Sequence, residues 1–207
     1  MLYASHRQTG PWGRRPIVPT VWDPTKTAGD GTLSFANGNR DGASSGFGNH
    51  DTILSVAPIS SASGRCYWEV EIISAGLGVY LGIQQHPFSP LGRVMWYGAG
   101  AAPVYVANPA GGEVVAANWA TFGAGDVIGL AVDWSARLFW GRKNGGTWQG
   151  GGDPSAGTGG ITFAPSVGAE WYAQALIHTT TVRLNAGQDA FVGAVPAGFD
   201  RGLGPYA

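Results

Sequence analysis

The clearest pattern in the chain is a strict alternation of apolar and polar side chains between Tyr67 and Ile73. Successive side chains of a β-strand point to opposite faces of its sheet, so the alternation predicts a strand with one face in the core and the other in solvent. The stretch Val79–Ile83 repeats the pattern after a turn at residues 74–78. Both segments are therefore expected to line one apolar core.

A further set of patterns predicts a β-hairpin. Residues 126–133 alternate in the same way, residues 134–136 form a turn, and residues 137–141 return as the second strand. Asn144 and Gly145 mark the next turn, since both tolerate a positive φ. Residues 37–48 are predicted to be a loop, because they are rich in residues that tolerate positive φ. The glycine-rich residues 145–160 are predicted to be a long surface loop with little order of its own. Other strands are predicted at Thr32–Ala36, Asp51–Ala57, Glu170–His178 and Thr179–Asn185.

The first 30 residues show neither a helical nor a strand period, and prolines interrupt them repeatedly. We predict an extended N-terminal arm over residues 1–30 that attaches the chain to a larger assembly, and one β-sandwich domain over residues 31–207. The residues expected to make this attachment are Trp12, Arg14, Arg15 and Trp22.

Composition narrows the choice of fold and partner. Charged residues make up 12% of the chain, against about 25% in an ordinary soluble domain, and there are 35 glycines. This argues against long surface helices and favours short strands joined by turns. The net charge of −1 provides no basic surface for nucleic acid, and no apolar run is long enough to span a membrane. The first 20 residues lack the apolar segment of a signal peptide, so no Sec-dependent export is expected.

Seven short motifs occur in the order and at the spacing found in the SPRY domain family. They are GRCYWEVEI (64–72), VYLGI (79–83), WYG (96–98), FGAGDVIGLAVD (122–133), LFWGRKNG (138–145), VRLNAG (182–187) and PAGF (196–199). On these motifs the chain resembles SPRY domains. The resemblance implies an all-β, two-sheet antiparallel sandwich of the concanavalin-like kind. It also implies a binding module that holds a peptide, protein or sugar through loops at one edge, without a cofactor.

In composition and layout the chain is also similar to SPRY-like modules of bacteriophage virion proteins, such as tail fibres, head fibres and decoration proteins. That likeness implies a non-catalytic virion component, present in several copies, which binds a host surface glycan or protein or a neighbouring subunit. A stand-alone carbohydrate-binding module is the alternative function. The expected location is the virion, with the cytoplasm or export without a Sec signal as alternatives.

Aromatic side chains in predicted loops and at strand ends are the first candidates for ligand contact, because their faces can stack on a sugar or hold a peptide. The residues in question are Trp96, Tyr97, Trp119, Trp148 and Trp171. Burial in the core is the alternative for each of them. Trp68 and Trp140 fall on core-facing positions and are predicted to be structural.

Polar residues before the second predicted strand form another candidate site. Arg40, Asp41 and His50 lie in or beside the loop at residues 37–48, where they can bind a sugar hydroxyl or stabilise the turn. Calcium needs six to eight oxygen ligands, more than this loop offers, and the remaining histidines are isolated. The single cysteine, Cys66, excludes an intramolecular disulfide and is predicted to be a small buried side chain. No metal site is predicted.

Glu69 and Glu71 offer the one pattern that resembles a catalytic pair. They point the same way from one strand, and their Cα atoms are about 6.6–6.8 Å apart at the usual rise of a strand. Glycoside hydrolysis needs two carboxylates at such a separation. Concanavalin-like glycosidases that use this arrangement carry a third carboxylate nearby, where this chain has Ile73 and Ser74. The pair is therefore predicted to be the solvated face of a strand, with a glycoside hydrolase as the alternative.

Overall fold

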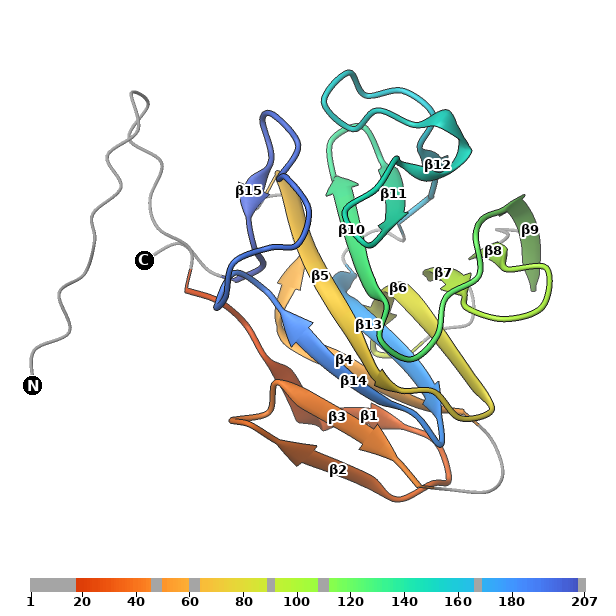
Figure 1. Cartoon of the computed structure of the whole chain (residues 1–207), viewed down its shortest axis with the longest axis vertical. Coiled ribbons are helices and arrows are strands. Elements are labelled where there is room, and N and C mark those ends of the chain that lie inside the picture. The colour runs from red at the N-terminus through yellow and green to blue at the C-terminus, as the bar shows by residue number, and fades with distance from the viewer. Residues whose placement is uncertain are drawn as a thin grey trace, which may run out of the picture.

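The computed structural model describes residues 18–45, 50–59, 64–88, 92–107, 112–165 and 169–204. Two β-sheets lie face to face, and apart from β15, which is parallel to β5, neighbouring strands run antiparallel (Figure 1). The predicted all-β sandwich is confirmed. Within the described ranges, no helix is long and apolar enough to cross a membrane.

One sheet has seven strands in the order β1-β4-β13-β6-β7-β8-β9. Their bounds are β1 Trp22–Ala28, β4 Asp51–Ile59, β6 Gly78–His86, β7 Arg93–Tyr97, β8 Pro103–Ala107, β9 Glu113–Asn118 and β13 Glu170–His178. β13 is an interior strand, paired with β4 on one side and β6 on the other. Strands from the beginning and end of the chain therefore lie side by side in this sheet.

The other sheet has the order β12-β11-β10-β5-β14-β3-β2, and β15 adds to β5 off this path. Their bounds are β2 Leu33–Ala36, β3 Asp41–Ser44, β5 Arg65–Ser74, β10 Val127–Asp133, β11 Leu138–Lys143, β12 Ile161–Thr162, β14 Thr181–Asn185 and β15 Asp200–Arg201. The one helix in the described part of the chain is a 3₁₀ turn, η1, at Gln149–Gly151.

The core lies between the sheets and follows the alternation seen in the sequence. Trp68, Val70 and Ile72 of β5 are fully buried, and the apolar side chains of β6 are in the same cluster. Cys66 is buried there too, and burial raises the pKa of its thiol. The predicted hairpin of β10 and β11 is also confirmed, with positive φ at Asn144 in the turn that follows.

The glycine-rich segment 145–160 is more regular than predicted. Trp140 donates its Nε1–H to the carbonyl of Thr158 at 2.8 Å, and Asp153 pairs with Thr158 in a short bridge. Trp140 belongs to a second apolar cluster, with Tyr67, Ala131 and Phe199, separate from the cluster between the sheets. The segment therefore folds around a buried tryptophan instead of forming an open loop.

Two predicted boundaries are wrong. β1 pairs with β4, and Trp22 is fully buried, so residues 22–28 belong to the sandwich and not to an arm. β3 lies inside the predicted loop at residues 37–48, because its alternate residues are small glycine and serine side chains that give no apolar signal. The other attachment residues, Trp12, Arg14 and Arg15, lie outside the described residues.

Asp23 stabilises the turn in β1 and makes the fold sensitive to acid. Burial favours the neutral acid, but hydrogen bonds from Lys26 and Thr25 outweigh it and hold the pKa of Asp23 at about 2. A folded-state pKa below the ordinary value stabilises the fold above pH 4, and this stabilisation is lost as the pH falls toward 2.

Asp23→Asn is therefore expected to lower the free energy of unfolding by about 2 kcal/mol at pH 7. The difference from the unaltered protein should shrink between pH 4 and pH 2, as measured by urea denaturation at each pH. Asp153→Asn, at an exposed turn aspartate, is the control. A difference that stays constant across this range would contradict the assignment.

Candidate binding surface

Three of the five aromatic residues proposed for ligand contact are buried in the core. Trp96 and Trp171 are fully buried, and Trp119 is nearly so. Trp96 packs edge-on against Trp119 with ring centroids 5.0 Å apart, and Trp171 packs against Phe163 at 5.6 Å. The prediction that these three rings face a ligand is therefore wrong, since the space between the two sheets is wide enough to enclose them.

The fourth, Trp148, is half-buried and has a structural partner. Its ring lies 4.5 Å from the guanidinium of Arg142 and 6.1 Å from the ring of Tyr67. Arg142 is buried between the two aromatic rings, 4.9 Å from Tyr67. This stack attaches the segment at residues 145–160 to the sheet, so Trp148 is placed to hold a loop.

Tyr97 and His50, by contrast, come together on the outer surface of the seven-stranded sheet. Tyr80 links them, because its ring stacks on Tyr97 at 4.3 Å and meets the His50 ring edge-on at 5.1 Å. His178 lies 5.2 Å from His50, and Tyr105 lies 6.2 Å from Tyr80. We call these five residues, Tyr80, Tyr97, Tyr105, His50 and His178, the tyrosine face.

Register explains why the tyrosine face forms. Tyr80 of β6 lies directly opposite Tyr97 of β7, and Met95 of β7 lies opposite Tyr105 of β8. Each tyrosine alternates with buried residues such as Val79 and Val104, which point into the core. This alternation in the sequence indicates that Tyr80 and Tyr105 point away from the core. That their rings lie close together follows only from the pairing of β6, β7 and β8.

Burial shifts the pKa values of two residues of the tyrosine face, Tyr80 and His50. Burial, followed by the neighbouring Tyr97 and Tyr105, raises the pKa of Tyr80. Burial and the nearby His178 lower the pKa of His50, so the neutral imidazole is favoured. Glu113 and Arg93, which form an ion pair, act on the pKa of Tyr80 in opposite directions. Aromatic rings with polar tips and little net charge are typical of protein-binding surfaces.

Gln174 lies beside this surface on β13 and has an unusual environment. Its neighbours along the strand, Ala173 and Ala175, point into the core, so Gln174 points outward. It pairs in register with Gly82 and Leu54, and its side chain is only 1% exposed. Neither its amide nitrogen nor its amide oxygen has a hydrogen-bond partner among the described residues. A buried carboxamide without partners is costly, so Gln174 lowers the stability of the sheet at this position.

The second candidate group, Arg40 and Asp41, lies on the other sheet and away from His50. Arg183 donates to both carboxylate oxygens of Asp41, at 2.7 and 2.9 Å, and Arg40 pairs with Asp189. The prediction that Arg40, Asp41 and His50 share one polar loop site is therefore wrong. No group of three or more His, Cys, Asp or Glu residues in the described part of the chain is arranged to hold a metal ion.

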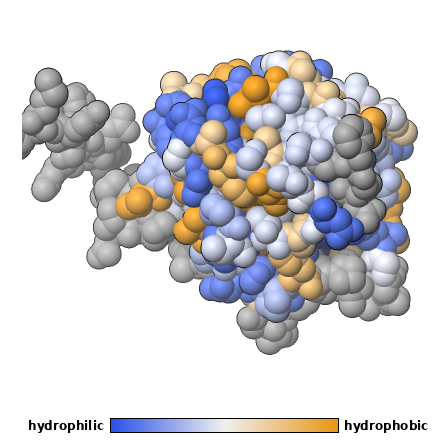
Figure 2. Space-filling model, turned by 90° about the horizontal axis from the view of Figure 1, so that it is seen from below, coloured by the Kyte–Doolittle hydropathy of each residue, from blue (hydrophilic) through white to orange (hydrophobic). Residues whose placement is uncertain are grey.

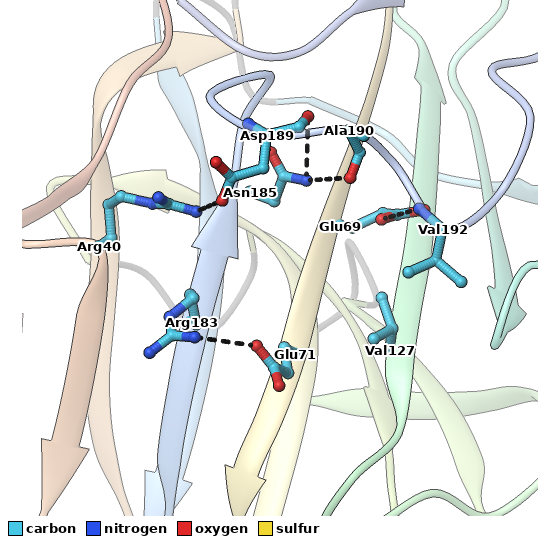
Figure 3. Close-up of a pocket in the computed structure, with 9 residues that line it drawn as sticks. All are labelled: Arg40, Glu69, Glu71, Val127, Arg183, Asn185, Asp189, Ala190 and Val192. Carbon is cyan, nitrogen blue, oxygen red and sulfur yellow. Dashed lines mark hydrogen bonds and ion pairs between the residues drawn. The ribbon is translucent and has the colours of Figure 1, made fainter. Parts of the chain in front are cut away.

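Arg40 lines a small cavity of about 160 Å³ on the outer side of β5 and β14, shown in Figure 3. Glu69 and Glu71 both line it, as do Arg183 and Asp189. Arg183 pairs with Glu71 at 3.3 Å, and Arg40 pairs with Asp189. Both arginines of the cavity are therefore paired with a carboxylate of the protein itself.

Glu69 is not the solvated side chain that the alternation predicts. It is 2% exposed and accepts hydrogen bonds from the Tyr67 hydroxyl at 2.6 Å and from the backbone N–H groups of Val192 and Gly193 at 2.9 Å. A carboxylate that is almost fully buried and held by three donors is not accessible to a sugar. The geometry thus gives Glu69 a structural role and disfavours the glycosidase alternative.

Comparisons with known proteins support the fold. No family model matches the chain, and no curated protein matches it in sequence. Among solved structures, the SPRY domain of human HERC1 is similar, with a TM-score of 0.57 and 20% identity over 82% of this chain and 99% of that domain. A human SPRY domain has a TM-score of 0.51 and 14% identity over 76% of this chain and 97% of that one. A structure of stonustoxin has a TM-score of 0.51 and 18% identity, covering 81% of this chain and 27% of the toxin chain. At these identities the comparisons show a SPRY-like sandwich.

Proposed function

We propose that this chain is a non-catalytic protein-binding module and that the tyrosine face is its binding surface. The observation that carries the proposal is the convergence of Tyr80, Tyr97 and Tyr105, all half-buried, on the outer surface of one sheet. Tyrosine is enriched in protein interfaces because it offers a large rigid contact area and a polar tip. SPRY domains generally bind proteins, which agrees with this reading.

A peptide is favoured over a sugar as the ligand. A sugar stacks on the open face of an aromatic ring, but Tyr80 and Tyr97 lie nearly parallel to each other, at 16° and 4.3 Å. Each ring therefore covers one face of the other.

The test is selection from a random peptide library on the immobilised protein, with a glycan array run in parallel. We expect enriched peptides whose affinity falls at least about tenfold in Tyr97→Ala, the loss typical of a central interface tyrosine. Val192→Ala, which removes an exposed apolar side chain from the segment between β14 and β15, should leave their affinity unchanged. Glycan binding without any peptide binding would favour the carbohydrate-binding alternative instead.

Gln174→Met provides a second variant for the same peptides. It removes two unpaired polar atoms without a large change in shape, so we expect the free energy of unfolding to rise by about 1 kcal/mol. Because the carboxamide is buried, the peptide affinity should not change. A fall in both quantities would indicate damage to the sheet.

Membership of a phage virion remains a prediction. The three similar structures named above are not described as phage proteins, and residues 1–17 of the predicted arm lie outside the described residues. The backbone N–H of Thr20 donates to the carbonyl of Leu203 at 2.9 Å, and Trp22 is in the core. A truncation that tests attachment to a virion must therefore end before Val18, so that the sandwich stays intact.

A further inference from the structure

β9 is an edge strand of the seven-stranded sheet and lies at the far end of that sheet from β1 (Figure 1). Within the described part of the chain it pairs only with β8. The other side of β9 therefore presents backbone N–H and C=O groups that no described strand uses. Such an edge is a template for pairing with another strand, and proteins usually protect it.

The other three sheet edges carry protective features. β1 contains Pro24 and Lys26, and its pairing with β4 is interrupted by a register shift. β12 has only two residues, which is too short to add another strand. β2 has four residues, and its two large apolar side chains, Leu33 and Phe35, pack against the core. Proline, lysine, irregular pairing and short length all discourage edge-to-edge contact.

β9 has one of these protections, a bulge at Ala116, and lacks the others. It is six residues long, contains no proline or lysine, and places Val114 and Val115 in solvent at 47% and 54% exposure. Val115 pairs with Tyr105 and Val114 with Val106, so the two valines extend from opposite faces of the sheet. Other exposed apolar residues are scattered, and in Figure 2 apolar and polar residues alternate over the face shown. Val114 and Val115 therefore differ from the other exposed apolar residues, because they are adjacent and lie on a free sheet edge.

We propose that β9 pairs antiparallel with β9 of a second copy of this chain, which joins two seven-stranded sheets across a two-fold axis. Self-pairing of this kind closes after two copies. The one charged residue of β9, Glu113, lies at its end and is paired with Arg93, so antiparallel pairing places the two glutamates on opposite sides of the axis. Because β9 has no unpaired charge that would select another partner, a second copy fits it.

The regular part of β9 supports this pairing. A bulge leaves Ala116 without a partner in β8, so Glu113–Val115 is the straight stretch, and it carries both exposed valines. A six-residue edge buries less than the roughly 1,600 Å² of a standard interface. The dimer is therefore an equilibrium that depends on concentration. Since Tyr105 lies next to Val115, pairing would also place two tyrosine faces on one continuous sheet, although the dimer does not depend on that function.

Sedimentation velocity over a range of concentrations tests the proposal. We expect the unaltered protein to shift from monomer to dimer as its concentration rises. Val114→Lys and Val115→Lys should each weaken the dimer at least about tenfold, because each would place like charges near the axis. Val56→Lys is a matched control, at 46% exposure on β4, which has a partner strand on both sides. A single monomeric species up to about 1 mM, or equal weakening by Val56→Lys, would overturn the proposal.

A cross-linking measurement locates the contact. The only cysteine in the chain, Cys66, is buried, so a newly introduced cysteine is the one accessible thiol. Under mild oxidation, Val115→Cys should form a covalent dimer in high yield and Val56→Cys should not. Circular dichroism of both variants shows whether the sandwich remains folded. Equal cross-linking of the two variants would indicate random collision and would count against pairing at β9.

Discussion

Glu69→Ala is expected to lower the free energy of unfolding by about 3 to 5 kcal/mol. The Glu69 carboxylate lies at 2% exposure and accepts three hydrogen bonds, two of them from the backbone of Val192 and Gly193. Its removal leaves the Tyr67 hydroxyl and these two N–H groups without an acceptor. Each buried donor left unpaired is costly.

Arg142 adds to the expected cost. Its guanidinium donates to the Tyr67 hydroxyl at 2.9 Å and to the carbonyl of Ala194 at 2.5 Å. Glu69 and Arg142 thus bind consecutive backbone groups of residues 192–194 and share Tyr67 between them. Without Glu69, the buried positive charge of Arg142 has no carboxylate nearby in this network, which is destabilising in a low-dielectric site.

Glu71→Ala is the matched control for this prediction. Glu71 lies two residues along the same strand, but its side chain is 42% exposed and pairs with the half-exposed Arg183. An exposed ion pair is worth about 0–1 kcal/mol, so the loss should be small. Urea denaturation gives both values, and hydrogen exchange should show faster exchange of the Val192 and Gly193 amides only in Glu69→Ala. Equal losses in the two variants would show that burial of Glu69 has no special role.

Glu69 also shows where prediction from sequence stops. Alternation in residues 67–73 predicted the strand and its core-facing side, because apolar residues at every second position of a strand all lie on the same, buried face. It assigned Glu69 to solvent, since no local pattern indicates that a segment more than 100 residues later folds across the outer side of the strand. The cover is made by residues such as Phe191 and Phe199, which pack around Tyr67 and Trp140.

The binding surface was predicted only in part for a related reason. Tyr97 and His50 were found because each is a large or polar residue near the end of a predicted strand. Tyr80, Tyr105 and His178 were missed, because their proximity depends on the pairing of β6 with β7 and β13 and of β7 with β8. Trp96 and Trp171 were placed wrongly because aromatic content alone does not tell a core ring from a surface ring. Sheet order, which the sequence does not encode locally, decides both outcomes.

Gly82→Ala is expected to lower the free energy of unfolding by about 3 kcal/mol or more. Gly82 pairs with Met95 where β6 and β7 approach closely. A Cβ atom at Gly82 would overlap the carbonyl oxygen of Val94 and lie 3.1 Å from the Cα of Met95. Both are backbone atoms, so relief requires the two strands to separate, unlike a clash with a flexible side chain.

The same separation would disturb the tyrosine face, because Tyr80 and Tyr97 lie on β6 and β7, two residues from Gly82 and Met95 respectively. Gly82→Ala should therefore lose peptide affinity as well as stability, whereas Gly123→Ala, with no atom within 4 Å of the added Cβ, should change neither. Denaturation curves and peptide titrations of the two variants decide the matter. If Gly82→Ala kept full stability, the distance between β6 and β7 would have to be larger than the structure shows. The close stacking of Tyr80 on Tyr97, which depends on that distance, would then be contradicted as well.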